Sequence, residues 1–225
     1  MRAVIFDVDG TLVDSVDLHA KAWVDAFAHF GHDVSFEKVR MQIGKGGDQL
    51  LPVFLSKEQL TREGKAIEQW RGDHFKRVYL GRVTGFPKVR DLFQRLISDG
   101  WKVALASSAK QDELEVYKKI ARIDDLLDTE TSSDDAEKSK PHPDIFQAAL
   151  NRLGASPEDC VVVGDSPYDA EAATKAGIPA IGFRCGGFPE AALTAAGYQA
   201  LYQSPADLLA SYEASTFHLA VERDQ

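Results

Sequence analysis

Short apolar runs recur along this chain, with segments of helical periodicity between them, and acidic or hydroxyl residues follow the first three runs. The runs cover residues 3–6 (AVIF), 102–106 (KVALA), 160–163 (CVVV) and 179–183 (PAIGF). None alternates polar with apolar residues, as expected of parallel strands covered on both faces. Residues 89–97 and 145–153 carry apolar side chains at helical spacing. The alternation predicts an α/β fold with a doubly wound parallel sheet, in which ligands bind beyond the carboxyl ends of the strands.

Residues 15–84 interrupt this alternation. Residues 18–30 and 59–80 place apolar and aromatic side chains at helical spacing, and the Gly-rich stretch 43–47 divides the block into two halves. We therefore expect an inserted, all-helical cap domain at residues 15–84, with a Rossmann-like catalytic core formed by residues 1–14 and 85–225.

Composition excludes several classes of protein. The 225 residues include 26 Lys and Arg against 35 Asp and Glu, a net charge of −9, and 44% are hydrophobic. A nucleic-acid partner needs clustered cations and is excluded, and so is a disordered chain. The two cysteines, Cys160 and Cys185, suit neither a disulfide framework nor a zinc site. With no apolar segment long enough for a bilayer, we expect a cytoplasmic protein, monomeric or a small homo-oligomer, without a membrane partner.

Pairs of carboxylates follow two of the predicted strands. Asp7 and Asp9 come directly after the first run, and the period of two in an extended chain sends both to one side. Asp165 follows the CVVV run, and Asp169 lies at the start of the next helix, where an N-terminal cap is the alternative role. Two nearby carboxylates share a proton or bind a cation, and an all-oxygen ligand set favours Mg²⁺.

A hydroxyl pair and a lysine lie between these acids in the sequence. Ser107 and Ser108 end the KVALA run, where an anion can bind near the next helix, and Lys140 precedes a helix that begins near Pro143. Each feature is weak alone, but the order of acid pair, hydroxyl, lysine and acid pair at one sheet edge indicates phosphoryl transfer.

These residues resemble the motifs of the haloacid dehalogenase superfamily of phosphatases over nearly the whole chain. The motifs are, in order, the segment from Asp7 to Ser15 (DVDGTLVDS), Ser107, Lys140 with Pro141, and Gly164-Asp165 with Asp169. The resemblance implies that Asp7 is the nucleophile that forms an aspartyl-phosphate. It also implies that Asp9 protonates the leaving oxygen and then activates water.

The same resemblance implies a magnesium site. The Asp7 carboxylate, the Asp9 main-chain carbonyl and Asp165 would bind Mg²⁺, with Asp169 supporting these ligands from behind. Ser107, Ser108 and Lys140 would bind the phosphate. Dehalogenases of this superfamily lack an acid at the position of Asp9, so its presence here favours phosphate ester chemistry.

The helical insert resembles the cap of the subclass that contains phosphoglycolate phosphatase, sugar-phosphate phosphatases and β-phosphoglucomutase. His19 stands in a segment similar to the hinge of the sugar-phosphate members, and Lys45 and Gly46 stand in a loop more like that of phosphoglycolate phosphatases. Lys76 lies near the position of a mutase cap lysine. The mutase loop bears an arginine that binds a second phosphate, whereas no arginine lies between Gly44 and Leu50 here.

The motifs and the resemblance leave three functions open. The first is a Mg²⁺-dependent phosphatase for a small phosphorylated metabolite such as phosphoglycolate or a sugar phosphate. The second is a β-phosphoglucomutase-type phosphomutase. The third is a non-enzymatic phospho-switch, which the cap of about seventy residues and the second acid pair oppose.

Charge is divided unevenly along the chain. Residues 15–84 hold 11 Lys and Arg against 9 Asp and Glu, whereas the remainder holds 15 against 26. A mildly basic cap over an acidic, metal-binding core can attract phosphate despite the net charge. Residues 124–137 hold seven acids and no Lys or Arg, which indicates a solvated connection.

Overall fold

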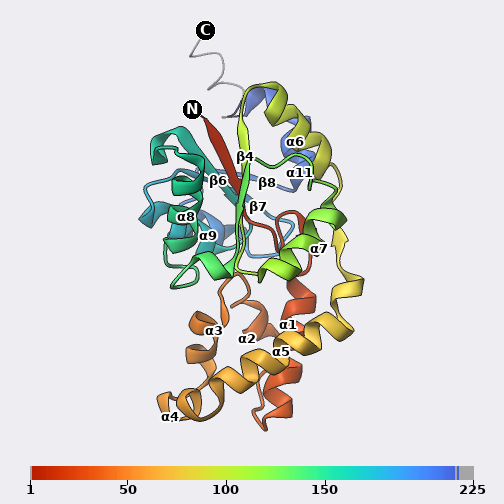
Figure 1. Ribbon diagram of the computed structural model, residues 1–225, viewed down its shortest axis with the longest axis vertical. Coiled ribbons are helices and arrows are strands. Elements are labelled where there is room, and N and C mark those ends of the chain that lie inside the picture. The colour runs from red at the N-terminus through yellow and green to blue at the C-terminus, as the bar shows by residue number, and fades with distance from the viewer. Residues whose placement is uncertain (1, 216, 218–225) are drawn as a thin grey trace.

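The computed structural model describes residues 2–215 and 217 and has two parts. A parallel sheet with helices on both faces forms the larger part, and a group of helices lies beyond one end of this sheet (Figure 1). Residues 218–225 of the predicted core range lie outside the described residues.

Six parallel strands form the sheet in the order β5-β4-β1-β6-β7-β8. Their bounds are β1 Ala3–Phe6, β4 Lys102–Ala106, β5 Thr129–Thr131, β6 Cys160–Gly164, β7 Ala180–Phe183 and β8 Ala200–Tyr202. In β1, Phe6 lies opposite Leu105 of β4 and Val163 of β6. The carboxyl ends of the three central strands therefore meet at one edge, and the predicted doubly wound α/β fold is confirmed.

Alternate residues of β1 belong to two separate cores. Val4 and Phe6 join the cluster that contains Phe93, whereas Ala3 and Ile5 join the cluster that contains Phe146. The first face is covered by α6 (Val89–Ser98), α7 (Gln111–Ala121) and α11 (Pro205–Ala210), and the second by α8 (Asp144–Leu153), α9 (Pro167–Lys175) and α10 (Glu190–Ala196). Burial on both faces explains why the strand sequences are apolar without alternation.

The cap lies between two short strands, β2 (Val13–Asp14) and β3 (Thr84–Gly85), which pair antiparallel. Its helices are α1 (Val16–His29), α2 (Phe36–Arg40), α3 (Gly47–Phe54), α4 (Lys57–Gln59) and α5 (Lys65–Val78), with a π-helical turn at Leu60–Gly64 and a 3-10 turn at Leu80–Arg82. Buried side chains such as Trp23, Phe27, Leu50 and Ile67 give the cap a core of its own. The chain leaves the larger part after β2 and re-enters it at β3. The division into a cap at residues 15–84 and a core at residues 1–14 and 85–225 stays a prediction.

Helix ends follow the local sequence. Pro143 immediately precedes α8, and Gly154 ends it with φ +62. Gly100, with φ +81, follows Asp99, which caps the C-terminus of α6. Glycine suits both ends because other side chains are strained in the left-handed region. The core also contains 3-10 turns at Ser133–Asp135, Pro157–Asp159 and Tyr212–Ala214.

The acidic segment 124–137 is not simply a solvated connection, so that prediction is wrong. It contains the edge strand β5, which pairs with β4. Glu130 of this strand accepts from Lys118 at 2.7 Å, and Asp125 accepts from Arg90 at 2.6 Å. Arg90 belongs to α6 and Lys118 to α7. Both cations lie outside residues 124–137, so the composition of this segment does not reveal its ion pairs.

Replacing Phe93 by alanine tests the core on the α6 face. Phe93 is fully buried, and its ring lies 4.6 Å from that of Phe6. We expect Phe93→Ala to lower the free energy of unfolding by about 3–5 kcal/mol, because a large cavity would remain. Ile97 on the same helix is 39% exposed, and Ile97→Ala should cost less than about 1 kcal/mol. Urea denaturation measures both, and equal losses would contradict this account.

Candidate active site

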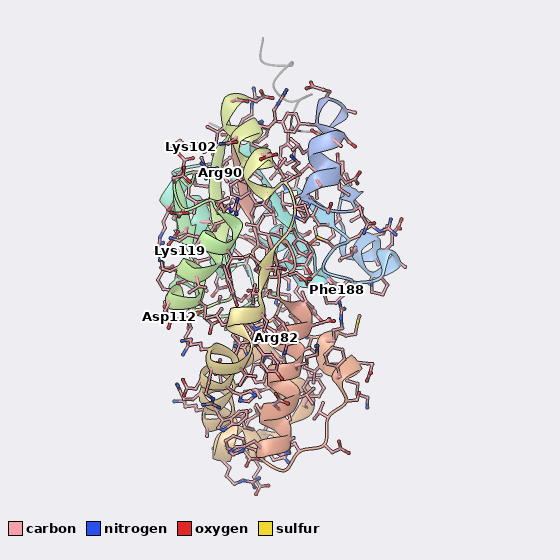
Figure 2. All side chains as sticks on the ribbon, turned by 90° about the vertical axis from the view of Figure 1, so that its right-hand side faces the viewer. Arg82, Arg90, Lys102, Asp112, Lys119 and Phe188 are labelled. Atoms are coloured by element: carbon pink, nitrogen blue, oxygen red, sulfur yellow. The ribbon has the colours of Figure 1, made fainter. Side chains whose placement is uncertain are left out.

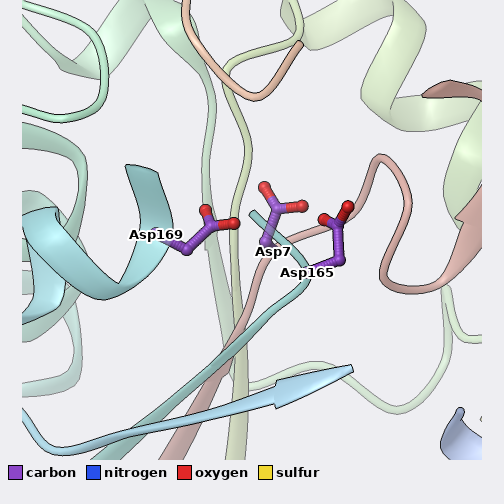
Figure 3. Close-up of side chains that lie close together, drawn as sticks. All are labelled: Asp7, Asp165 and Asp169. Carbon is purple, nitrogen blue, oxygen red and sulfur yellow. The ribbon is translucent and has the colours of Figure 1, made fainter. Parts of the chain in front are cut away.

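Three carboxylates converge at the carboxyl edge of the sheet. Asp7 follows β1, Asp165 follows the neighbouring β6, and Asp169 lies in the first turn of α9. Each offers an oxygen within 4.8 Å of the others (Figure 3). Asp7 and Asp165 meet because Phe6 and Val163 are partners in the parallel ladder, which sends both strands out at the same height.

Lys140 lies fully buried among these acids. Its Nζ is 2.5 Å from Asp7 Oδ1 and 2.7 Å from Asp169 Oδ1, and it donates to the Ala106 carbonyl at 3.2 Å. The ammonium therefore donates hydrogen bonds to Asp7 and to the Ala106 carbonyl, and it forms an ion pair with Asp169. Burial opposes the charged form of Lys140, but the charges of Asp169 and Asp7 outweigh it and raise the pKa of Lys140 above its usual value.

One ammonium does not balance three carboxylates. Burial raises the pKa of Asp7 to about 7 although Lys140 lowers it, and Asp169 adds to the increase. Burial and the charges of Asp169 and Asp7 also raise the pKa of Asp165 well above its usual value. Thr11 Oγ1 lies 3.2 Å from Asp7 Oδ2 and 3.1 Å from Asp165 Oδ1. The excess buried negative charge and the oxygen-only donors suit a divalent cation.

Asp169 is held from a second side. Its Oδ2 accepts from the Ser166 main-chain N–H at 3.1 Å and from the Ser166 hydroxyl at 2.7 Å, while its Oδ1 faces Lys140. Asp169 therefore helps to cap the N-terminus of helix α9, and it also contacts Lys140. Gly164 permits this packing, since a Cβ there would lie 2.5 Å from the Asp169 side chain.

Asp9 is bound by residues of the cap helix α1 and its N-terminus. Asp9 Oδ1 accepts from the Ser15 hydroxyl at 2.6 Å and lies 2.8 Å from His19 Nε2. Arg71 of α5 lies 2.5 Å from His19 Nδ1, and because arginine only donates, the network assigns the imidazole hydrogen to Nε2, facing Asp9. Burial alone would raise the pKa of Asp9, but His19 and Ser15 lower it below its usual value.

A cavity lies between the cap and the carboxyl edge of the sheet. Asp7 and Asp9 line it from the core, together with Ser108 and Lys110. Its lining from the cap includes His19, Trp23, Lys45, Gly46, Glu68, Arg71, Gly72 and Lys76. The catalytic pair predicted from the sequence and all the predicted cap residues therefore share one cavity.

The two predicted cap lysines, Lys45 and Lys76, already contact other side chains. Lys45 Nζ donates to Gln42 Oε1 at 2.6 Å and lies 4.6 Å from the centre of the Tyr168 ring. Lys76 Nζ pairs with Asp112 Oδ2 at 2.6 Å. Asp112 lies at the lower edge of the core, facing the cap (Figure 2). The cap cation that reaches the Asp9 network is Arg71, not Lys76.

Further contacts close the cap against the core. Arg40 of α2 donates to the carbonyls of Gly186 at 2.9 Å and Gly187 at 3.2 Å. The Tyr168 hydroxyl donates to the Met41 carbonyl at 2.6 Å, and Asp48 accepts from the Ser139 N–H at 3.1 Å. These contacts join the α2–α3 segment of the cap to the core, so the cap is held against the core on this side by hydrogen bonds.

The phosphate-binding residues predicted from the sequence have different positions. Ser108 lines the cavity, whereas Ser107 is fully buried and accepts from the Ala109 N–H at 3.0 Å. Lys140 reaches Asp7 from beneath the cavity and is not among its lining residues. Ser108 therefore faces the cavity, whereas Ser107 and Lys140 lie buried behind its wall.

Three residues near the acids were not predicted from the sequence. Thr11 stands within the first motif, so its proximity to Asp7 could have been inferred. Arg71 and Tyr117 carried no local signal, because their places depend on how α5 and α7 pack around His19. The Tyr117 hydroxyl lies 3.1 Å from His19 Nε2.

Carboxylates at the ends of parallel strands, paired with a buried lysine beneath a helical cap, define a capped α/β enzyme. The chain belongs to the haloacid dehalogenase-like hydrolases, whose family model matches residues 4–183. This match confirms the predicted family and the prediction of an enzyme of the haloacid dehalogenase type.

Relatives and solved structures agree with this assignment. The chain is 32% identical over 189 residues to Protein SUPPRESSOR OF QUENCHING 1, chloroplastic, from Arabidopsis thaliana, covering 80% of this chain but only 18% of that protein. It is 28% identical over 178 residues to pyrophosphatase PpaX from Oceanobacillus iheyensis, covering 79% of this chain and 81% of the relative. A hydrolase from Pseudomonas syringae superposes with a TM-score of 0.86 at 26% identity, covering 95% and 99% of the two chains.

Within residues 2–215 and 217, no helix combines the length and apolar character that crossing a membrane requires.

Lys140 offers a direct test of the charge balance. We expect Lys140→Ala to lower the free energy of unfolding by about 3–5 kcal/mol in the presence of a chelator, because buried carboxylates would lose their counter-charge. Lys175 is an exposed control that donates to the Pro141 carbonyl at 2.7 Å. Lys175→Ala should change the stability by no more than about 1 kcal/mol. Urea denaturation compares the two, and a Lys140→Ala protein as stable as the wild type would contradict the balance described here.

Proposed function

We propose that the protein is a Mg²⁺-dependent phosphatase that hydrolyses the phosphate monoester of a small metabolite through an aspartyl-phosphate on Asp7. One observation carries the proposal. Asp7 lines the cavity while Lys140 holds one of its oxygens, and Asp9 lines the same cavity while His19 holds one of its own. A nucleophile and an acid–base group are thus fixed separately on the same wall.

The first step transfers the phosphoryl group. An Asp7 carboxylate oxygen attacks phosphorus, and the bond from phosphorus to the leaving oxygen breaks. Asp9 enters this step protonated, because the negative charge of the bound phosphate favours its neutral form, and it gives its proton to the leaving oxygen. Lys140 keeps the Asp7 side chain oriented through its contact with Oδ1. Ser108 lines the cavity where the phosphoryl oxygens would bind, and the buried Ser107 would support this loop.

The second step releases phosphate. Asp9 takes a proton from a water molecule, the water oxygen attacks phosphorus, and the Asp7 carboxylate leaves unchanged. His19 and Ser15 favour the ionised form of Asp9, which is the form that accepts this proton. The contact of Asp9 with His19 makes this environment depend on the cap, and Arg71 orients the His19 ring from α5.

Asp7, Asp165 and the main-chain carbonyl of Asp9 would hold Mg²⁺, with Asp169 fixed behind them by Ser166 and Lys140. When bound, the ion supplies positive charge that offsets the charge of the phosphoryl oxygens. Its binding would also offset the buried carboxylates, whose raised pKa values reflect missing counter-charge.

The size of the cavity favours a small substrate. Its volume of ≈ 130 Å³ corresponds to about four water molecules at their liquid volume, or to one small compact molecule. This suits a compact metabolite such as phosphoglycolate or a sugar phosphate better than a macromolecule. The pyrophosphatase relative also acts on a small phosphorylated compound, as its name states.

A phosphomutase is the less favoured alternative. Such an enzyme must hold the second phosphate of a bisphosphate at the cap. Lys45 is already engaged by Gln42 and Tyr168, and Lys76 by Asp112. Neither cap lysine is therefore free to bind a second phosphate, which the mutase requires and hydrolysis does not. Conversion of a β-sugar 1-phosphate into the 6-phosphate without release of phosphate would favour the mutase.

A metabolite-phosphate screen tests the proposed activity. We expect the wild type with Mg²⁺ to release phosphate from at least one member of a panel containing phosphoglycolate, sugar phosphates, pyrophosphate and nucleotides. Asp7→Asn should release none, because an amide cannot act as the nucleophile, and a chelator should stop the wild type until Mg²⁺ is restored. Asp33→Asn, in an exposed acid outside the cavity lining, serves as a control that keeps activity. A wild type inactive on the whole panel, or an active Asp7→Asn, would contradict the proposal.

A further inference from the structure

Gly72 stands in the interior of α5 (Lys65–Val78) without a structural reason for glycine. Glycine is among the poorest helix formers, since it loses the most backbone freedom on folding. The residue has no positive φ, and a Cβ built on it would meet no atom within 4 Å. Gly46 and Gly47 differ, because a Cβ there would lie 2.0 Å from Ser139 and 2.4 Å from Glu68. Neither the backbone nor the packing demands glycine at position 72.

The bare helix surface at Gly72 faces the active-site cavity. Gly72 lines this cavity together with Asp7 and Asp9. Glu68 lies one helical turn before it and Lys76 one turn after it, and both also line the cavity. The helix α5 crosses the cap below the sheet (Figure 1), and its residues Glu68, Gly72 and Lys76 line the same cavity as Asp7 and Asp9.

We infer that the space over Gly72 receives the leaving group of the substrate and that Gly72 sets how large this group can be. This inference rests on the proposed phosphatase function. A leaving group there would lie between the Glu68 carboxylate, which accepts hydrogen bonds, and the Lys76 ammonium, which donates them. Asp112 offsets the charge of Lys76, whereas no described residue pairs with Glu68 in a salt bridge. The space therefore suits a neutral, hydroxyl-bearing leaving group better than a second anion.

A size-dependent loss of activity tests the inference. Gly72→Val should lower kcat/KM for ribose 5-phosphate and glucose 6-phosphate by about tenfold or more, because its side chain fills the space. The same variant should leave kcat/KM for acetyl phosphate unchanged, since the small acetyl group does not reach α5. Ala66→Val puts the same side chain on an exposed position of α5 outside the cavity lining and should change neither activity.

The outcomes separate this inference from the proposed function. A Gly72→Val protein that keeps its activity on the sugar phosphates, or that loses activity equally on acetyl phosphate, would overturn the inference. So would a wild type that hydrolyses acetyl phosphate but neither sugar phosphate, although the proposed phosphatase function would stand. A wild type inactive on all three and on the wider panel would remove both.

Thermal unfolding provides an independent readout. Gly72→Ala should melt at or above the temperature of the wild type, because alanine favours the helix and its Cβ meets no neighbour. A clear fall in the melting temperature of Gly72→Ala would mean that the glycine is required for folding. That result would overturn its assignment as a residue kept open for substrate.

Discussion

The contact of Lys140 with Asp7 and Asp169 is the interaction on which the rest of the site depends. Parallel strands bring acids together at one edge, and burial without a counter-charge would force them to take up protons. The Lys140 ammonium lies between two of them and also satisfies the carbonyl at the end of β4. One side chain thus ties together β1, β4 and α9. The negative charge that it leaves unbalanced creates the place for a cation.

The cap completes the site through the second acid. Asp9 belongs to the core, yet its partners His19 and Arg71 belong to α1 and α5 of the cap. The environment of Asp9 therefore depends on contacts with the cap, whereas that of Asp7 is set within the core. The uneven division of charge suits this arrangement, since a net-acidic chain can bind an anion where a metal and a basic cap shape the local field.

The central strands β1, β4, β6 and β7 could be predicted from the sequence. Burial on both faces makes their residues apolar without alternation. The edge strands β5 and β8 could not, since Thr129–Thr131 and Ala200–Tyr202 are only partly buried and form by pairing with distant segments. Asp7, Asp9, Asp165 and Asp169 were placed together because strand ends meet at one edge. Arg71 was not found, because its contact with His19 arises from the packing of α1 against α5.

The central claim is that Asp7 carries the phosphoryl group during turnover. Acid-quenched turnover followed by mass spectrometry of the proteolytic peptides tests it most directly. The account predicts a single phosphoryl group on the peptide that contains Asp7, removed by hydroxylamine as expected of an acyl phosphate and absent from Asp7→Asn. Phosphorylation at another residue, or turnover by Asp7→Asn, would contradict the account.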